Sequence, residues 1–312
     1  MTVKSMDQVK FLVFADLHHY PGVFYTQARE RLAAIMQRAE KAQVDCAISL
    51  GDFCHSPSAF GDIIADFDAA LVPVRHVLGN HDTDGASVKE TLRLYHMQHE
   101  YYSFDLKNFR FIMLDTNYYR HSGGFTHFEY RNYFDFPESR ETLPPEQIDW
   151  LEQTIRTSPY PCLLFSHASI ERESKGGVSN RDAILAMIRR ANSGSRKVLM
   201  ALNGHHHRDA LRIIDNVAFF DVNSASFDWL NQPHELYPES LRREFELINH
   251  QVIYTEPLSA IVTISGDNSI EIEGKKGDFL HGIRREMTNN SRCDNAGRPC
   301  TPEILSARFR LF

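Results

Sequence analysis

Short apolar runs that end abruptly in polar residues recur along the chain, and longer amphipathic stretches separate them. Such runs are typical of buried strands, whereas apolar positions spaced by three or four residues are typical of helices. The runs predict strands at 10–15, 45–50, 74–78, 162–166, 197–203, 210–215 and 217–222. The amphipathic stretches predict helices at about 25–43, 58–71, 87–97 and 143–155. Strands that alternate with helices in this way indicate a layered α/β fold.

Two pairs of apolar segments predict hairpins, which add antiparallel strands. "YYSFDL" and "FRFIMLD" flank the turn residues Lys107 and Asn108, and "AIVTIS" lies close to "SIEIEG". We therefore expect either one mixed sheet or two packed sheets. The periodicity fades after residue 224, so we expect one domain over residues 1–283 and a C-terminal tail, residues 284–312, that packs on it.

The composition is that of an ordinary globular protein, with 42% hydrophobic and 24% charged residues. A net charge of −7 disfavours nucleic acid or an anionic membrane as a partner, because both attract basic surfaces. No apolar stretch approaches the roughly 20 residues that a membrane-spanning helix needs. The N-terminal residues lack a secretory pattern and the five cysteines are scattered, so we expect a cytoplasmic protein.

Polar side chains follow five of the predicted strands. They are Asp16 and His18, then Asp52, then Asn80 with His81, then His167, and finally His205 with His207. Each cluster alone has an ordinary explanation, such as a turn, a capped helix, a hydrogen-bonded structural histidine or a surface patch. Their order and placement together are not ordinary, because ligands of open α/β sheets bind beyond the carboxyl ends of the strands. The sequence therefore predicts one site that all five clusters share.

The series D-x-H, GD, GNHD, H and GHxH resembles the signature of the calcineurin-like metallophosphoesterase superfamily over about residues 10–210. The resemblance implies a four-layer α/β/β/α sandwich with two mixed sheets and a metal site at the carboxyl ends of the strands. It also implies two bound metal ions and hydrolysis of a phosphate ester by a hydroxide that bridges them.

The resemblance also implies a role for each residue. Asp16, His18 and His207 would hold the first metal, Asn80, His167 and His205 the second, and Asp52 would bridge the two. His81 would be catalytic and would face the leaving-group oxygen, a task that suits a side chain with an unperturbed pKa near 6.5. Imidazoles with carboxylates and an amide suit divalent or trivalent Mn, Fe or Zn better than Ca²⁺ or Mg²⁺.

The three consecutive histidines in "GHHH" need to be told apart. Side chains two apart in an extended segment share a side, so His205 and His207 are the expected ligands and His206 turns away. By the same reasoning His18 is the ligand and His19 is not. Asp82, the last residue of "GNHD", either orients a neighbour or caps a helix.

The expected substrate is a phosphodiester or a small phosphomonoester. His55 stands where purple acid phosphatases carry a metal-bound tyrosine, and the pattern with GNHD is more similar to the bacterial class III cyclic-nucleotide and glycerophosphodiester phosphodiesterases. Residues 116–139 are either a substrate-contacting segment or a surface loop, and the Gly pair in 171–180 could flex as a lid. The alternative to an enzyme is a catalytically weak, metal-stabilised scaffold that binds protein partners.

Overall fold

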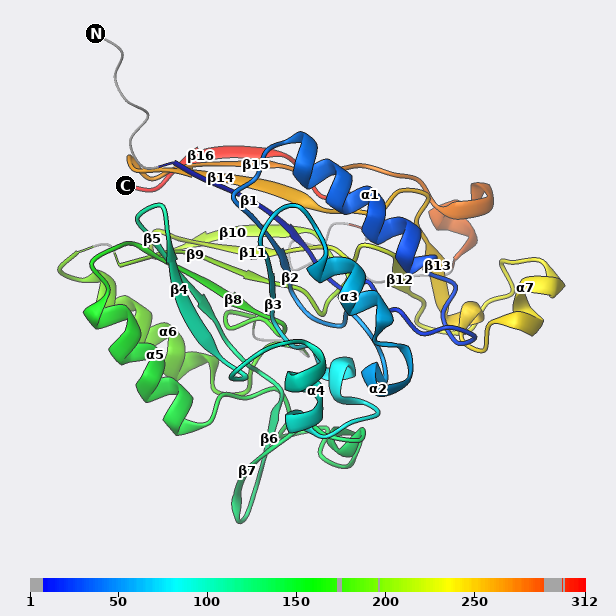
Figure 1. The fold of residues 1–312 in the computed structure, drawn as a ribbon, viewed down its shortest axis with the longest axis horizontal. Coiled ribbons are helices and arrows are strands. Elements are labelled where there is room, and N and C mark those ends of the chain that lie inside the picture. The colour runs from blue at the N-terminus through cyan, green and yellow to red at the C-terminus, as the bar shows by residue number, and fades with distance from the viewer. Residues whose placement is uncertain (1–7, 173–175, 196, 289–298, 300) are drawn as a thin grey trace, which may run out of the picture.

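Two six-stranded sheets lie face to face at the centre of the molecule (Figure 1). The computed structural model describes residues 8–172, 176–195, 197–288, 299 and 301–312. The first sheet has the order β16 (Ala307–Arg310), β15 (Ser269–Glu273), β14 (Ala260–Ser265), β1 (Gln8–Phe14), β2 (Cys46–Ser49), β3 (Val74–His76). The second has the order β10 (Ala210–Ile214), β11 (Val217–Asp221), β9 (Val198–Asn203), β8 (Cys162–Ser166), β5 (Phe109–Met113), β4 (Tyr102–Leu106).

Helices cover the outer faces of both sheets. Figure 1 shows α1 (Ala28–Lys41) and α3 (Asp62–Asp68) over the first sheet and α5 (Pro145–Thr157) and α6 (Arg181–Asn192) over the second. Three buried apolar layers separate these four layers of structure: one between the sheets and one beneath each pair of helices. The predicted four-layer α/β/β/α sandwich with two mixed sheets is therefore confirmed.

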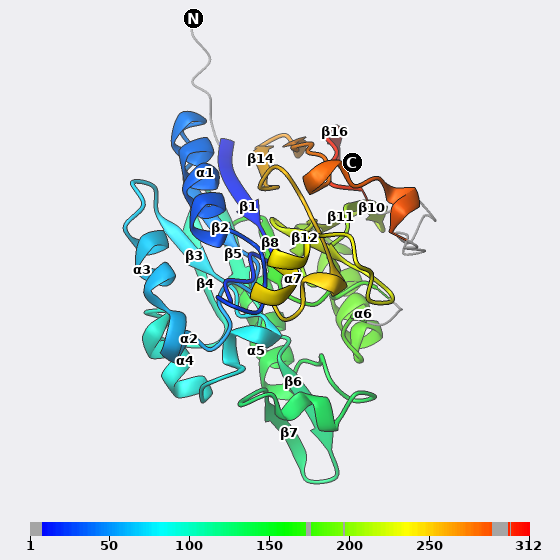
Figure 2. The same cartoon turned by 90° about the vertical axis from the view of Figure 1, so that its right-hand side faces the viewer.

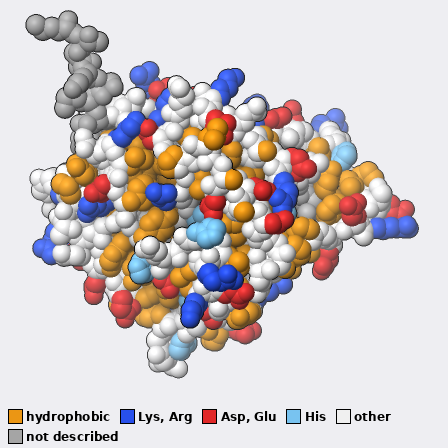
Figure 3. Space-filling model, in the orientation of Figure 1, with side chains coloured by type: hydrophobic (Ala, Val, Ile, Leu, Met, Phe, Trp, Pro, Cys, Tyr) orange, Lys and Arg blue, Asp and Glu red, His pale blue; other side chains and the backbone are white. Residues whose placement is uncertain are grey.

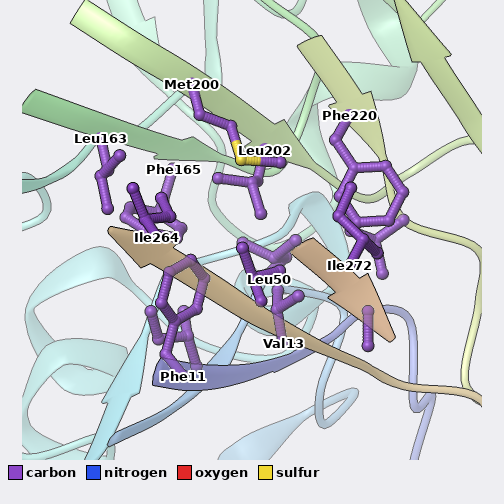
Figure 4. Close-up of a cluster of buried hydrophobic side chains, with 14 of the residues drawn as sticks. Phe11, Val13, Leu50, Leu163, Phe165, Met200, Leu202, Phe220, Ile264 and Ile272 are labelled. Carbon is purple, nitrogen blue, oxygen red and sulfur yellow. The ribbon is translucent and has the colours of Figure 1, made fainter. Parts of the chain in front are cut away.

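Strand β1 explains why its sequence is continuously apolar. Phe11 and Val13 point into the layer between the sheets, whereas Leu12 faces the layer under α1 and α3. Figure 4 shows this central layer, in which Phe11 approaches Phe111 and Phe165 of the second sheet with ring centroids 5.5 and 5.7 Å apart. A strand that is buried on both faces needs apolar side chains at every position. The two sheets are joined mainly by this burial.

Strand directions bring the polar strand ends to one edge. β1, β2 and β3 run parallel, as do β5, β8, β9 and β11, whereas β14 pairs with β1 in the opposite direction. Parallel neighbours end at the same edge of a sheet. The chain segments that follow β1, β2, β3, β8 and β9 therefore start from neighbouring positions.

The remaining elements partly follow the predictions. Both predicted hairpins form, as β4–β5 and as β14–β15, and the Ser87 hydroxyl caps α4 (Val88–Leu94) by accepting from the Glu90 amide. The single helix expected at 58–71 is two helices, α2 (Pro57–Phe60) and α3. Between them lies Gly61, where a Cβ would come 2.3 Å from the Pro57 carbonyl oxygen. Helix α6 has no counterpart among the predicted elements.

Residues 116–139 contain regular structure where we expected a long loop. Strands β6 (Tyr118–His121) and β7 (Gly124–His127) form a hairpin that projects from the body, as Figure 2 shows. A 3₁₀ turn, Asn132–Asp135, follows the hairpin and returns the chain to the body. This excursion therefore has a defined shape.

The C-terminal third adds two features to the sandwich. Strands β12 (Phe227–Trp229) and β13 (Gln251–Ile253) form a small sheet, and α7 (Glu239–Glu244) lies in the segment that connects them. β16 pairs with β15, so the end of the chain supplies an edge strand of the first sheet. The predicted boundary after residue 283 stays a prediction.

Two surface properties follow from the described residues. None of their helices combines the length and the apolar character that crossing a bilayer requires. On the face in Figure 3, basic and acidic side chains are interspersed with hydrophobic ones.

Arg31 ties α1 to the C-terminal third. The side chain is buried, and it donates hydrogen bonds to the carbonyl oxygens of Thr26 (2.5 Å), Ala225 (3.2 Å) and Tyr254. Burial lowers the pKa of Arg31 to about 10, so the guanidinium remains charged at neutral pH. One cation thus satisfies three carbonyl groups from segments that are distant in the sequence.

We expect Arg31→Ala to reduce the free energy of unfolding by about 2–4 kcal/mol, because three carbonyl oxygens lose a charged donor. Urea unfolding followed by circular dichroism measures this change. Arg29→Ala is the control, because Arg29 lies on the same helix and forms only exposed ion pairs with Asp62 and Asp66. The control should change stability by no more than about 1 kcal/mol. Equal losses in the two variants would contradict the role given to Arg31.

Candidate metal centre

The structure brings all the predicted site residues together beyond the carboxyl ends of β1, β2, β3, β8 and β9. Among the described residues, three groups of side chains have ligand atoms that all lie within 4.8 Å of one another. Two of them consist of predicted metal ligands: Asp16, His18 and His207, and Asp52, His167 and His205. The third is His55, His81 and Asp84. Asn80 joins the second group, since its Oδ1 lies 3.1 Å from Nε2 of His167. The two groups contain the residues of the two ligand sets that the resemblance implies.

Asp52 lies between the two groups. Its Oδ2 is 3.8 Å from Nε2 of His18 and 3.3 Å from Nε2 of His167. Its Oδ1 accepts a hydrogen bond from the backbone amide of His81 at 2.9 Å, which fixes the carboxylate. Burial would raise the pKa of Asp52, but the charge of His167 and of the other histidines lowers it well below its usual range. The side chain is thus an oriented anion that faces both groups.

The hydrogen bonds of two histidines show where their ring protons lie. His167 Nδ1 is 2.8 Å from the Leu50 carbonyl oxygen and His207 Nδ1 is 2.7 Å from that of Phe227. Because a carbonyl oxygen only accepts, each Nδ1 carries a proton, and in the neutral ring Nε2 offers a lone pair to the site. Metal-ligating histidines typically donate their other ring N–H in this way.

Facing ring nitrogens need a proton or a cation between them, because two lone pairs cannot face each other at this distance. Nε2 of His207 is 3.0 Å from Nε2 of His18, and Nε2 of His167 is 3.1 Å from Nδ1 of His205. Burial lowers the pKa of both His18 and His205, which keeps these rings neutral. Burial opposes charge on His167 too, but the Asp52 carboxylate raises its pKa to about 10. A cation or a proton therefore belongs in each group, and the donor sets fit metal ions.

Five of the site residues adopt a left-handed backbone conformation that side chains other than glycine rarely accept. The φ angles are 55° for Asp16, 52° for His18, 50° for Asp52, 71° for His205 and 52° for His207. Such conformations cost of order 1–3 kcal/mol each and cluster at functional sites. The extended conformation that we assumed for 205–207 is therefore wrong: left-handed residues, not an extended strand, present His205 and His207.

His206 belongs to neither group, as expected. Its ring packs against Gly176, where a Cβ would come 2.2 Å from the His206 Cε1 atom. Residues 173–175, which precede Gly176 in the segment that we considered as a lid, lie outside the described residues. The middle histidine thus lies against Gly176 and outside both ligand groups.

Glycine at two motif positions lets the loops approach. A Cβ on Gly79 would lie 2.1 Å from the backbone nitrogen of Asp52 and 2.3 Å from its Oδ1. A Cβ on Gly204 would lie 2.8 Å from Oδ2 of Asp16. Any side chain at these positions would displace a carboxylate from its place between the histidines.

Asp82 ties the GD loop to the GNHD loop. Its carboxylate accepts hydrogen bonds from the backbone amides of Phe53 (2.9 Å), Cys54 (3.0 Å) and Gly79 (2.7 Å), and from the Tyr95 hydroxyl (2.5 Å). It caps the turn that begins at Asn80 and also orients its neighbours, so both of the roles considered for it apply.

His81 is held by partners that the sequence analysis did not assign. Its Nδ1 lies 2.7 Å from Oδ2 of Asp84 and 3.1 Å from the Tyr133 hydroxyl, which donates to Oδ1 of Asp84 at 2.9 Å. Burial alone would lower the pKa of His81, but Asp52 and Asp84 outweigh it and raise that pKa. With Nδ1 directed at Asp84, the free nitrogen of the ring is Nε2.

His55 connects the first ligand group to the same carboxylate. Its Nε2 lies 2.8 Å from Nδ1 of His18 and its Nδ1 lies 3.5 Å from Oδ2 of Asp84. Burial lowers the pKa of His55 to about 4, so the ring is neutral. If Nε2 of His18 faces a metal, its Nδ1–H donates to His55, which leaves the proton of His55 on the side of Asp84.

Asp84 therefore receives contacts from both His55 and His81, and the two rings stack with centroids 4.3 Å apart. The spacing H-x-x-D after GN was a sequence signal for Asp84. Tyr133 and Glu141 gave no such signal, because each comes from a distant segment. Glu141 Oε1 lies 4.0 Å from Nε2 of His205, an ionic contact that is longer than a hydrogen bond.

A family model described as calcineurin-like phosphoesterase matches residues 9–209. The match spans more than half of the chain, and the chain therefore belongs to the calcineurin-like phosphoesterase family. Its two groups of aspartate and histidine side chains agree with the two metal ions that this family typically binds. The resemblance at the level of the superfamily is confirmed, and its bacterial branch stays a prediction.

Solved structures share the fold. One is a dimetal phosphatase from Danio rerio, with a TM-score of 0.61 and 18% identity over 85% of this chain and 95% of that one. Another is GAP50, the anchor in the inner membrane complex of Plasmodium, with a TM-score of 0.56 and 13% identity over 98% and 90% of the two chains. No curated protein matches the sequence significantly. At these identities the likeness is one of fold.

Proposed function

We propose that this protein is a phosphoesterase that uses two metal ions held by the candidate metal centre. The observation that carries the proposal is the position of Asp52, whose Oδ2 faces His18 at 3.8 Å and His167 at 3.3 Å. A carboxylate between two three-residue ligand groups is the arrangement that a bridging ligand needs. The proposed substrate is a phosphodiester or a small phosphomonoester, and the proposed compartment is the cytoplasm.

The ligands divide between two ions of Mn, Fe or Zn. Asp16, His18 and His207 would hold the first ion, Asn80, His167 and His205 the second, and Asp52 both. Two such ions, when bound, stabilise charge on a phosphoryl group and make water an effective nucleophile at neutral pH. The Nδ1–H bonds of His167 and His207 would orient those rings toward the ions, and the Glu141 carboxylate lies near the His205 ring.

His81 would donate a proton to the leaving-group oxygen. The Asp84 carboxylate holds Nδ1, so Nε2 is available to the substrate, and the raised pKa of His81 favours the protonated form that a donor needs. Its backbone amide already binds Asp52, which keeps the ring beside the metal centre. Asp84 and His55 are positioning residues in this scheme, because they act through His81 and His18.

Hydrolysis of a panel of phosphomonoesters and phosphodiesters tests the proposal. The metal-free chain is reconstituted with Mn²⁺, Fe²⁺ or Zn²⁺, and metal content is measured alongside turnover. We expect two ions per chain and hydrolysis that depends on them. A chain that binds two ions but cleaves no ester of the panel would favour the metal-stabilised scaffold instead. A chain that binds no metal would contradict both the phosphoesterase and the metal-stabilised scaffold.

Single-ligand variants should separate the two ions. We expect Asn80→Ala to weaken the second ion more than the first, because it removes a neutral oxygen near His167, and His207→Ala to weaken the first ion. Titration of each variant with Mn²⁺, followed by calorimetry and by activity, measures the two affinities. Variants that weaken both ions equally would argue against this division of the ligands.

A further inference from the structure

The segment 128–141 borders the candidate metal centre on the side of His81 and His205. Phe128 and Tyr133 are buried and pack on each other with ring centroids 4.7 Å apart, and the Tyr130 amide donates to the Thr83 carbonyl oxygen at 3.0 Å. Side-chain hydrogen bonds of Asn132 to the backbone of residues 127 and 129 hold the turn. The segment is therefore a built wall of the site, and its outward side chains have defined positions.

Arg131 stands at the end of this wall that is next to His81. Its Nε lies 3.6 Å from Oδ2 of Asp84, and its guanidinium lies over the Phe134 ring at 5.3 Å. The side chains of Arg131 and Phe134 are both about half exposed. Because Asp84 is the partner of His81, Arg131 lies close to the position at which His81 would meet a leaving group.

Arg140 lies on the same segment and also borders the aromatic pair Tyr133 and Phe134. Its Nε lies 3.3 Å from Oε1 of Glu141, the carboxylate that lies 4.0 Å from His205. Its guanidinium lies 5.8 Å from the centre of the Tyr133 ring. The two arginines thus flank the aromatic pair Tyr133 and Phe134, and each touches a carboxylate that contacts a site histidine.

The guanidinium groups of both arginines can still donate hydrogen bonds to a ligand. Across the described residues, the guanidinium groups of Arg131 and Arg140 make no side-chain hydrogen bond, and their approaches to a carboxylate, 3.6 and 3.3 Å, are through Nε. A guanidinium presents a planar fork of donors that matches a carboxylate or a phosphate. The half-exposed Phe134 ring offers a flat surface for a planar group.

We propose that Arg131 and Arg140 bind a second anionic group on the substrate, carried by the leaving group and attached to a planar ring. This inference rests on the proposed function, since it places the leaving group beside His81. It names a substrate class: phosphoesters whose leaving group bears a carboxylate or a further phosphate. Residues 116–139, which the sequence left as either substrate-contacting or a surface loop, would then contact the substrate.

Two phosphonates that differ only in charge test the proposal without turnover. 4-Carboxyphenylphosphonate and its neutral counterpart 4-carbamoylphenylphosphonate are titrated into the Mn²⁺-loaded protein by calorimetry. We expect the carboxylate to bind about tenfold more tightly, the order expected of one charge-assisted hydrogen bond. Arg131→Gln and Arg140→Gln should each reduce the preference severalfold and leave the affinity for the carbamoyl compound within about twofold.

Arg120→Gln is the matched control, because Arg120 is an exposed arginine in the same excursion of the chain, on β6. This variant should keep the full preference. Equal affinity of the wild type for the two phosphonates would overturn the proposal, as would a preference that survives in both Arg131→Gln and Arg140→Gln.

The corresponding aryl phosphates separate this proposal from the proposed function. If neither 4-carboxyphenyl phosphate nor 4-carbamoylphenyl phosphate is cleaved with any metal, the phosphoesterase proposal fails, and the phosphonate preference still decides the binding role of the arginines. If both are cleaved with equal kcat/KM and equal KM, the enzyme stands and the anion-binding role is rejected.

Discussion

Asp52→Asn is expected to lower kcat/KM by at least about 10³-fold and to leave the chain with fewer than two metal ions. The reason is that one side chain faces both ligand groups, and an amide removes the negative charge between two cations. Charge stabilisation by bound metals is worth several kcal/mol, which corresponds to a factor of this order. Elemental analysis and steady-state kinetics on the same preparation measure both effects.

Asp149→Asn is the control, because Asp149 is an exposed carboxylate on α5, which covers the outer face of the second sheet. It should leave metal content and activity unchanged. An Asp52→Asn protein that holds two ions at full occupancy would show that Asp52 is not the bridge. Anomalous scattering from crystals would then locate the ions with respect to this residue.

His81→Ala is expected to keep both metal ions and to lower kcat by about 10²–10⁴-fold, the range of a positioned acid or base. His81 is next to Asn80 in the sequence, but its ring is bound to Asp84 and not to the ligand groups, so its removal leaves the ligands in place. The loss should be smaller for nitrophenyl esters, because a good leaving group needs less protonation. Kinetics with esters of graded leaving-group pKa measure this trend.

Metal content decides between this role and a supporting one. If His81→Ala loses the second ion together with activity, the ring supports the ligands and is not the proton donor. Asp84→Asn gives an independent comparison, because it removes the charge that holds Nδ1 of His81 and leaves the ring present. We expect the kcat of Asp84→Asn to lie between those of the wild type and of His81→Ala, and its pH profile to be shifted.

Much of the fold could be predicted from the sequence because its signals are local. Continuous apolar runs marked the strands that are buried on two faces, and Ser87 marked a helix start whose cap lies three residues away. The hairpin with the turn Lys107–Asn108 was equally readable, since both turn residues adopt positive φ between adjacent strands. Helix α6 and the break at Gly61 were missed, the latter because the apolar spacing continues through it.

The ligand set could also be predicted, because a general rule converts position in the sequence into position in space. Strands that run parallel end at one edge, so polar residues directly after β1, β2, β3, β8 and β9 meet. His18 and His207 are 189 residues apart in the chain, yet their Nε2 atoms are 3.0 Å apart. Their identity as a motif and their order along the chain were enough to group them.

By itself, then, the sequence determined the α/β layering, the series of motif residues at the strand ends and the family to which they point. Only the tertiary structure decided which side chains surround them. His55, Tyr133 and Glu141 reach His18, Asp84 and His205 through contacts between loops, and loops have no period from which such contacts follow. Arg131 and Arg140 belong to the same class, because an exposed arginine looks the same in a sequence wherever it lies. Their place beside the metal centre depends on how residues 128–141 pack, and that packing involves the buried rings of Tyr119, Phe128 and Tyr133 and the bond of Tyr130 to Thr83.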